Sequence, residues 1–282
     1  MPEGDTLFRA ARALRLALAG RTVTHFETVL PALARVDEDA PIAGRAVEAV
    51  EAAGKHLLVT FTGGLVLRTH LRMSGSWHLY RPGERWRRPR HAMRIVIENA
   101  EAVAVAFDVP VAELLTPRQA ARQPDLLALG PDLLGPRFDP GEAARRIRAR
   151  AGDEIADVLL DQRVVAGIGN VFKSEVLFEA GIHPRRPVAS LSDGEVARVI
   201  EVARRQLQAN RGPEQLGTPT TWGGGRRTTG RAAPGEALWV YLRGGQPCRR
   251  CATPVVALRQ GFHARGTWFC PRCQPEHPGT GA

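Results

Sequence analysis

The stretch CRRCATPVVALRQGFHARGTWFCPRC, residues 248–273, contains all four cysteines of the chain. Two Cys-x-x-Cys pairs stand 18 residues apart, a spacing that is typical of zinc sites. Four thiolates complete the tetrahedral shell of one zinc ion, so the pattern predicts one structural Zn²⁺ held by Cys248, Cys251, Cys270 and Cys273. The residues between the pairs indicate a β-hairpin. Two disulfides are one alternative, which we do not expect because no secretory signal is present. A redox-active pair is the other, and we do not expect it either.

The charge of the chain indicates a polyanionic partner. Its 282 residues carry a formal net charge of +10, with an isoelectric point near 10.7. Nucleic acid is the partner that such a surplus favours, although an arginine-rich proteome would give the same number. Ten arginines face three glutamates between Arg211 and Ala282, which indicates a basic C-terminal module. No run of 18 apolar residues predicts a membrane span, and we expect a cytoplasmic protein.

The first half of the chain is typical of a helix followed by a β domain. Residues 3–19 place leucines and alanines at helical spacing, and Gly20 ends that pattern. Short β-rich runs follow at 47–50, 56–61, 65–71, 93–99 and 102–107, with turn signals at 62–64 and around Asn99. We therefore expect an N-terminal β-sandwich with flanking helices over residues 1–130, in a chain of the α+β class.

The second half is predicted to be helical and then irregular. A stretch rich in proline and glycine at 129–140 marks a domain boundary, and helical patterns cover 141–210, with Ser192 and Asp193 as N-cap candidates. We assign residues 131–211 to a helical domain and 212–245 to a mobile segment rich in Gly, Thr and Arg. The zinc finger spans 246–275, and 276–282 form a frayed tail.

The stretch QRVVAGIGNVFKSEVLFEAGIHP, residues 162–184, carries a candidate phosphate seat. Gly167 and Gly169 interrupt two helical runs, and Asn170 begins the second run. The amides at a helix start, with an asparagine side chain, form a natural site for a phosphate. Lys173 lies one turn further on. An ordinary helical hairpin is the alternative for this stretch taken alone.

Only two lysines, Lys55 and Lys173, occur among 39 basic residues. Arginine cannot lose its proton in a protein, whereas lysine can act as a nucleophile or as an acid and base. A surviving lysine in such a chain is therefore a candidate for chemistry, with chance survival as the alternative.

Five motifs together resemble the family of formamidopyrimidine-DNA glycosylase and endonuclease VIII, which remove oxidised bases from DNA. They are MPEG at 1–4, GKHLL at 54–58, LGPDLL at 129–134, GIGNVFKSE at 167–175 and ARGTWFCPRCQ at 264–274. Each is weak alone, but they occur in family order and at family spacing over essentially the whole chain. The resemblance implies a β-sandwich, a helix–two-turn–helix domain and a four-cysteine zinc finger, with damaged double-stranded DNA as the partner of a monomer.

The resemblance also implies the catalytic residues. In the family the initiator methionine is removed and the new N-terminal proline attacks the sugar, so Pro2 matches the nucleophile. An α-amine titrates near ~7.7–8.0, and a secondary amine can form an iminium with C1′. Glu3 matches the residue that moves protons to the sugar, and Lys55 matches the catalytic lysine of the β domain.

Three further matches concern DNA. Asn170 corresponds to the phosphate-binding asparagine, and Arg265 to the zinc-finger arginine that grips phosphates beside the flipped nucleotide; Lys173 lies near the same seat. A damaged base must leave the stack before its sugar can react. Met73, in HLRMSG, stands where the family places the side chain that fills the gap, although a core position is the alternative for it.

The chain departs from the family pattern at two places. Thr6 stands where many members carry a second acid, so we assign it no catalytic role. The Arg-Phe pair of the oxidised-purine branch is missing after Phe107, where Asp108 follows. The start MPEGDT resembles endonuclease VIII-like proteins of actinobacteria, whereas Met73 resembles the purine branch.

We therefore expect a DNA glycosylase and abasic-site lyase of base excision repair that favours oxidised pyrimidines and cuts by β,δ-elimination. An oxidised-purine glycosylase is the alternative of the same class. A zinc-dependent DNA-binding protein without catalysis is the alternative of another class, and the intact Pro2, Glu3 and Lys55 argue against it.

Overall fold

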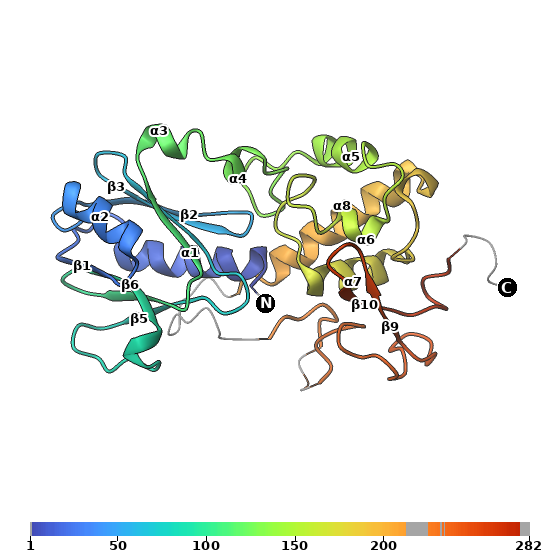
Figure 1. Ribbon diagram of the computed structural model, residues 1–282. Coiled ribbons are helices and arrows are strands. Elements are labelled where there is room, and N and C mark those ends of the chain that lie inside the picture. The colour runs from blue at the N-terminus through green and yellow to red at the C-terminus, as the bar shows by residue number, and fades with distance from the viewer. Residues whose placement is uncertain (1, 213–224, 232, 234, 277–282) are drawn as a thin grey trace. The chain divides into compact units, whose positions relative to one another are not determined.

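A computed structural model describes residues 2–212, 225–231, 233 and 235–276 (Figure 1). The described residues divide into two compact units. Residues 2–127 with 211–212 form the first unit, and 128–210 with the described part of 225–276 form the second. In the described part of the chain, no helix is long and apolar enough to cross a lipid bilayer.

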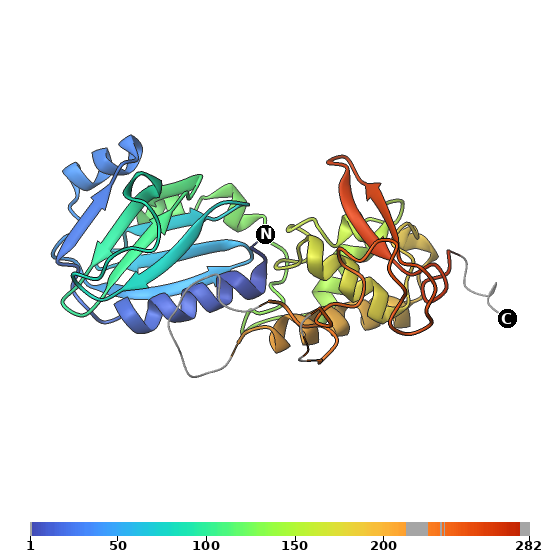
Figure 2. The same ribbon diagram turned by 90° about the horizontal axis from the view of Figure 1, so that it is seen from below.

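The first unit is a sandwich of two four-stranded antiparallel sheets with a long helix against it (Figures 1 and 2). One sheet has the order β2 (Val47–Ala53), β3 (His56–Phe61), β4 (Val66–His70), β8 (Val111–Leu115). The other has the order β1 (His25–Thr28), β6 (Met93–Glu98), β7 (Val103–Phe107), β5 (Ser76–Tyr80). Its helices are α1 (Gly4–Leu18), α2 (Pro31–Asp39), η1 (Arg90–Ala92), α3 (Pro117–Ala120) and α4 (Pro124–Leu127).

One core joins both sheets and α1, because each element turns its apolar face inward. Leu7, Leu14 and Leu18 of α1 are buried in the same cluster as Val59 and Ile97 from the two sheets. The predicted helix over residues 3–19 is thus confirmed, and burial of its leucine stripe is what holds it to the sandwich.

Five predicted β-rich runs are confirmed as β2, β3, β4, β6 and β7. The Asn99 turn joins β6 to β7, and its Oδ1 accepts the amides of Glu101 and Ala102 at 2.9 Å each. The prediction missed β5, because Ser76 and His78 are buried polar residues that break the expected apolar alternation. It also missed β1 and β8, whose four and five residues bury few side chains completely.

The second unit is helical and ends in the predicted hairpin. Its elements are α5 (Pro140–Arg148), α6 (Ile155–Val158), α7 (Asn170–Ala180), η2 (Val188–Ser190), α8 (Asp193–Ala209), β9 (Val256–Gln260) and β10 (Arg265–Phe269). Ser192 caps α8 as predicted, accepting the Glu195 amide at 3.2 Å. The helical pattern at 153–161 yields only the single turn of α6.

Part of the predicted mobile segment 212–245 and of the tail 276–282 falls on residues 213–224, 232, 234 and 277–282, which lie outside the described residues. The described part of the segment is fastened to α8. Asn210 donates from Nδ2 to the Arg227 carbonyl at 2.9 Å and accepts the Arg227 amide at 2.8 Å. The boundaries that we assigned to the five segments stay a prediction.

Candidate functional site

The first feature of interest is the start of α1. Glu3 is the N-cap residue, and its carbonyl accepts the amides of Thr6 at 2.9 Å and Leu7 at 3.1 Å. The Glu3 side chain is completely buried, while Pro2 is half-buried. A carboxylate at the start of a helix is stabilised by the helix dipole. The fold therefore fixes an acid next to Pro2.

The start of α1 lies at the same end of the sandwich as Lys55. Ala19 bridges to Val47 at the first residue of β2, and Arg15 donates to the Val50 carbonyl at 2.9 Å. As α1 is followed back toward its start, it therefore advances along β2 toward Ala53, and Figure 2 shows the N-terminus at that end. Pro2 and Glu3 belong to the end of the sandwich that carries the β2–β3 turn.

Lys55 sits on that turn. Gly54 and Lys55 are the two residues between Ala53 and His56, which pair across the hairpin. Gly54 takes φ +57°, a left-handed conformation that glycine adopts without strain, so the tight turn presents Lys55 at its tip. The lysine is half-buried.

The sequence analysis missed His70, which is the neighbour of Lys55. Burial, and then the charges of Lys55 and Arg72, lowers the pKa of His70 to about 4, so the imidazole is neutral at physiological pH. Its Nδ1 accepts the Arg72 amide at 3.1 Å, and its ring meets that of His56 edge-on at 4.9 Å. The sequence did contain a signal for His70. If the runs 56–61 and 65–71 pair across the turn at 62–64, His70 lies opposite His56, the residue that follows Lys55.

Met73 occupies an exposed turn between β4 and β5. Its side chain is 65% exposed, so the alternative that it is a core residue is wrong. The turn is tight, because Arg72 takes φ +44° and a side chain at Gly75 would meet the Leu71 carbonyl at 2.7 Å. Pro2, Glu3, Lys55 and Met73 thus all belong to one end of the sandwich.

In the second unit, Asn170 is the first residue of α7, as expected. Only 9% of it is exposed, and within the described part of the chain its buried Oδ1 has no hydrogen-bond partner. Gly169 is the N-cap residue, and Gly167 takes φ +108°. The helix start with an adjacent amide side chain is the arrangement that binds a phosphate.

The expectation that Lys173 contacts DNA is wrong. Its side chain is completely buried, and Nζ donates to the Thr267 hydroxyl at 2.7 Å and to the Gly266 carbonyl at 3.2 Å. An ammonium group enclosed in this way cannot reach a phosphate outside. Lys173 instead fastens α7 to β10 of the finger hairpin.

Glu175 is a second residue that the sequence analysis missed. Its carboxylate is completely buried and accepts three consecutive amides, those of Trp239 at 2.7 Å and of Val240 and Tyr241 at 2.8 Å each. The Thr228 hydroxyl also donates to it. Burial raises the pKa of Glu175, and these hydrogen bonds act in the opposite direction. The carboxylate holds the chain that leads into the finger.

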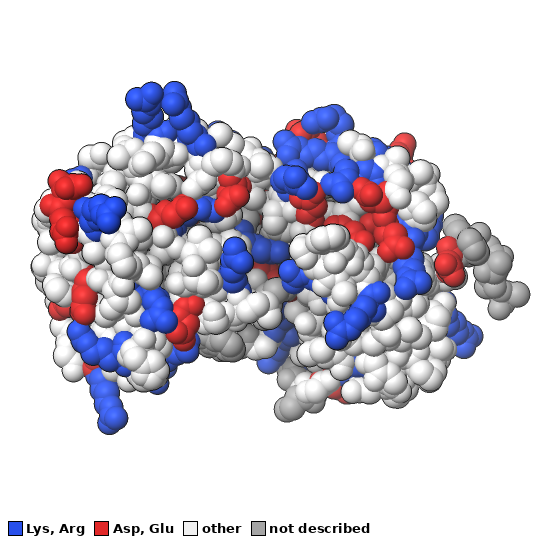
Figure 3. Space-filling model, in the orientation of Figure 1, with Lys and Arg blue, Asp and Glu red and all other residues white. Residues whose placement is uncertain are grey.

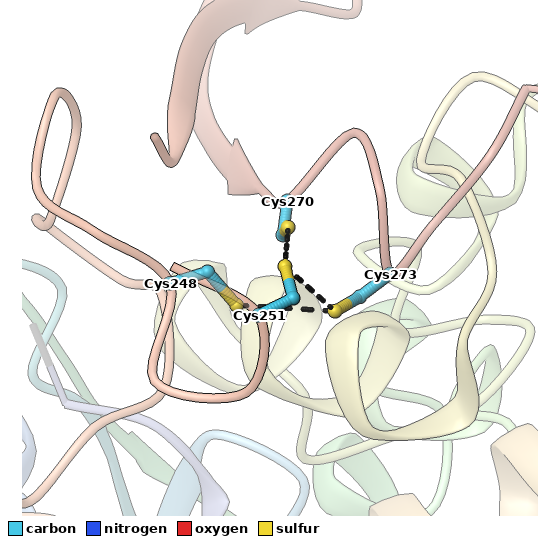
Figure 4. A group of neighbouring side chains, drawn as sticks. All are labelled: Cys248, Cys251, Cys270 and Cys273. Carbon is cyan, nitrogen blue, oxygen red and sulfur yellow. Dashed lines mark hydrogen bonds between the residues drawn. The ribbon is translucent and has the colours of Figure 1, made fainter. Parts of the chain in front are cut away.

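The four cysteines converge as predicted (Figure 4). Their sulfur atoms all lie within 4.8 Å of one another. The Sγ–Sγ distances are 3.5 Å between Cys251 and Cys270, 3.6 Å between Cys251 and Cys273 and 3.9 Å between Cys248 and Cys273. Thiolates at about 2.3 Å from a tetrahedral zinc lie about 3.8 Å apart, so the cluster fits one Zn²⁺ without rearrangement.

The finger hairpin presents Arg265 and is anchored at two other points. Arg265 is exposed at the first residue of β10. Gln274, completely buried after the last cysteine, donates to the Ile182 carbonyl at 2.8 Å. Gln260, at the end of β9, donates to the Pro184 carbonyl at 3.0 Å and to Glu154 at 2.5 Å. The finger is therefore held against the segment that follows α7.

Three family models match the chain. The formamidopyrimidine-DNA glycosylase N-terminal domain matches residues 1–109, and the formamidopyrimidine-DNA glycosylase H2TH domain matches 129–214. A zinc finger found in FPG and IleRS matches 245–275. The three matches agree in order with the sandwich, the helical part and the cysteine cluster.

Curated relatives match over nearly the full length. Probable endonuclease 8 2 of Streptomyces coelicolor is 43% identical over 277 residues, which cover 97% of this chain and 94% of the relative. The DNA-(apurinic or apyrimidinic site) lyase Nei2 of Mycolicibacterium smegmatis is 41% identical, with 97% and 99% covered. A formamidopyrimidine-DNA glycosylase of Symbiobacterium thermophilum is 36% identical, with 98% and 90% covered.

Solved structures share the fold. Lactococcus lactis Fpg in complex with abasic-site DNA aligns with a TM-score of 0.79 at 23% identity, covering 97% of this chain and all of the other. The same protein with DNA that contains N7-benzyl-Fapy-dG aligns with a TM-score of 0.77. The sandwich, the helical part and the cysteine hairpin thus recur together in a known architecture.

Proposed function

Because this chain belongs to the formamidopyrimidine-DNA glycosylase and endonuclease 8 family, we propose that it is a bifunctional DNA glycosylase and abasic-site lyase of base excision repair. Its substrate is double-stranded DNA with a damaged base or an abasic site, and it acts as a monomer. A DNA substrate implies that the enzyme works in the compartment that holds the chromosome, the bacterial cytoplasm.

The observation that carries the proposal is the convergence at one end of the sandwich. The buried Glu3 lies beside Pro2 at the start of α1, the Lys55 turn belongs to the same end, and Met73 is exposed there. A DNA-binding protein without catalysis has no need of a completely buried carboxylate next to its N-terminus. A nucleophile with an adjacent proton donor is what acyl- and glycosyl-transfer sites require.

The first chemical step uses Pro2 after the initiator methionine has been removed. The neutral secondary amine attacks C1′ of the damaged nucleotide, a C1′–N bond forms, and the bond from C1′ to the base breaks. The Glu3 carboxylate takes the proton that the proline nitrogen loses after its attack and gives it to the ring oxygen O4′, which opens the sugar and leaves an iminium between Pro2 and C1′. The base takes up a proton from solvent as it leaves.

Two eliminations then cut the strand. Loss of a C2′ proton expels the 3′ phosphate, and loss of a C4′ proton through the conjugated system expels the 5′ phosphate. The Lys55 ammonium stabilises the negative charge of the phosphate beside the reacting sugar. Water finally hydrolyses the iminium and frees Pro2, so the enzyme is unchanged.

Residues of the second unit bind the DNA backbone. Asn170 and the start of α7 bind one backbone phosphate, and Arg265 binds another from the finger. Zinc, held by the four cysteine thiolates, supplies no chemistry to the reaction and stabilises the small hairpin that carries Arg265. Met73 fills the space left by the flipped base, as an unbranched apolar side chain can do.

Oxidised pyrimidines are the preferred lesions in this proposal. The segment after Phe107 reads Asp108-Val109-Pro110 and offers no cation of its own to read the orphaned base. The guanidinium groups that reach Asp108 are those of Arg88 and Arg94, in ion pairs at 2.5 and 3.3 Å. A base-reading contact contributes about 1–3 kcal/mol of discrimination, so opposite-base preference should be at least roughly tenfold weaker than in an enzyme with such a contact.

Borohydride trapping on duplexes with single defined lesions tests the proposal. The processed protein should form a covalent adduct with abasic-site DNA, and a variant that keeps Met1 should form none. Trapping that persists with Met1 retained would assign the nucleophile to Lys55 or another amine. No trapping by the processed protein would support the non-catalytic alternative.

The same duplexes test lesion choice. Thymine glycol and dihydrouracil should be released faster than oxidised guanine, whichever base stands opposite. Faster release of oxidised guanine, with a strong preference for cytosine opposite, would assign the protein to the purine branch.

A further inference from the structure

The loop between β5 and β6 has a composition that a simple connection does not need. Residues 81–91, RPGERWRRPRH, contain five arginines and one carboxylate, Glu84. We call these residues the arginine loop. Five like charges within eleven residues repel one another and favour an extended, disordered chain. The arginine loop is nevertheless folded against its sheet.

Contacts of three residues, Trp86, Arg87 and Arg88, fold the arginine loop back over the outer face of its sheet. Trp86 stacks on Tyr80 at 6.4 Å between ring centroids and meets Phe107 edge-on at 5.7 Å. The Arg87 amide donates to the Tyr80 hydroxyl at 3.1 Å. Arg88 donates to the Ser76 hydroxyl at 3.3 Å and to Asp108 at 2.5 Å. The aromatic cluster and these bonds offset the repulsion between the arginines.

The second half of the loop reaches the end of the sandwich that carries Met73. Arg88 contacts Ser76, the first residue of β5, and Asp108, which directly follows β7. Asp108 in turn accepts a hydrogen bond at its carbonyl from Ser74, the neighbour of Met73, at 3.2 Å. The loop and the Met73 turn are therefore joined through Asp108.

Three guanidinium groups on the loop face solvent without an acidic partner. Within the described part of the chain, no ion pair involves Arg81, Arg85 or Arg87, and all three are exposed. Residues 84–90 line an open hollow of about 580 Å³, and Arg85 and Arg87 are among them. Arg90 differs, because it pairs with Glu27 at 2.8 Å.

The other dense group of arginines is neutralised. Figure 3 shows basic and acidic side chains interleaved around α5. There, Arg145 and Arg146 pair with Glu142 at 2.7 and 2.6 Å, and Arg150 pairs with Asp153 at 2.5 Å. Unpaired cations on a folded segment are therefore a property of the arginine loop and not of the arginine-rich segment around α5.

We propose that the arginine loop is a contact of the β-sandwich with the DNA backbone, in which Arg85 and Arg87 bind phosphates of the duplex beside the site that Met73 enters. This inference rests on the proposed function, because it takes DNA as the partner. Planar guanidinium groups suit phosphate oxygens, and each contact releases counterions, which gives binding a measurable salt dependence.

The test compares two double variants of the full-length zinc-loaded protein. Arg85→Gln/Arg87→Gln removes the proposed contacts. Arg118→Gln/Arg122→Gln removes the same charge from two exposed residues on and just after α3. Pro117 of that helix lies against Gly64 in the β3–β4 turn, at the end of the sheet opposite Lys55, so the pair is a matched control. Binding to a duplex with a tetrahydrofuran abasic analogue is measured at several salt concentrations.

Loss of two phosphate contacts should lower the slope of log K against log salt by about two units, whereas the control pair should leave it unchanged. Phosphate-ethylation interference should disappear at about two positions of the duplex. A loop variant with the wild-type slope, or a control variant with the same loss, would overturn the proposal. Borohydride trapping of the same samples keeps the two proposals apart, because a protein that binds but does not trap refutes only the enzymatic one.

Discussion

Replacing Glu175 by glutamine should loosen the zinc finger, although Glu175 touches neither zinc nor DNA in the proposed mechanism. One carboxylate oxygen accepts the amides of Val240 and Tyr241, and the other accepts the Trp239 amide and the Thr228 hydroxyl. Glutamine keeps an acceptor on one side only. On the other side its NH₂ group replaces the acceptor of two charge-assisted hydrogen bonds: the Trp239 amide is left without an acceptor, and the Thr228 hydroxyl must turn to accept from the NH₂ group instead.

The loss of stability in Glu175→Gln can be estimated from these two hydrogen bonds. A hydrogen bond to a charged group contributes about 1.5–3 kcal/mol, so the loss of two costs about 3–6 kcal/mol. The neutral amide is easier to bury than a carboxylate, which favours the lower value, about 3 kcal/mol. For a unit of this size that corresponds to roughly 6–12 °C in the melting temperature.

Calorimetry of the zinc-loaded protein gives the melting temperature, and hydrogen exchange reports the amides of residues 239–241. Those amides should exchange faster in Glu175→Gln than in the wild type. Glu179→Gln, on the same helix, is the control, because Glu179 is partly exposed and its ion pair with Arg205 contributes about 0–1 kcal/mol. A Glu175→Gln protein within about 1 kcal/mol of the wild type, with unchanged exchange at 239–241, would refute the reasoning.

Three other predictions follow from the two units. Removal of zinc by a chelator should abolish DNA binding while the sandwich still melts cooperatively, and normal binding by zinc-free protein would contradict the role of the finger. Arg265→Ala should lower the salt slope by about one unit on every duplex sequence, as measured by titration at several salt concentrations; an unchanged slope would exclude a phosphate contact. Burial, and then Arg68, lowers the pKa of His56 to about 3, and burial with Lys55 lowers that of His70 to about 4, whereas an unfolded histidine titrates near ~6.5. The unfolded chain therefore binds more protons between about pH 6.5 and 4, so the stability of the first unit should fall as pH drops through that range, and less steeply in His56→Gln, when melting is followed against pH.

Much of the fold could be predicted because it depends on local patterns. Cysteine spacing gave the finger, a leucine stripe gave α1, and the glycines before Asn170 gave the start of α7. In each case the residues that decide the element are close together in the chain. The strand β5 escaped prediction because its buried Ser76 and His78 are satisfied by each other, with Oγ and Nε2 3.1 Å apart, which hydropathy cannot show.

The site was less predictable where contacts are distant in sequence. Lys173 looked like a phosphate ligand beside Asn170, but its acceptor Thr267 lies 94 residues away. The segment after Phe107 contains no cation, yet the fold brings Arg88 and Arg94 to Asp108, at 2.5 and 3.3 Å. Residue identity showed which groups were available, and only the fold showed which of them pair.

Helix α7 explains why loss of zinc should affect the phosphate site at Asn170 as well as the finger. Every residue of α7 except Glu179 is buried, so the helix has no solvent face to absorb a displacement. Asn170 begins it, Lys173 binds the hairpin strand β10, and Glu175 binds the chain that leads to Cys248. Loss of the hairpin would remove the Thr267 and Gly266 acceptors from the buried ammonium of Lys173, on the helix that positions Asn170. Metal loss should therefore weaken both phosphate contacts of the second unit, at Asn170 as well as at Arg265.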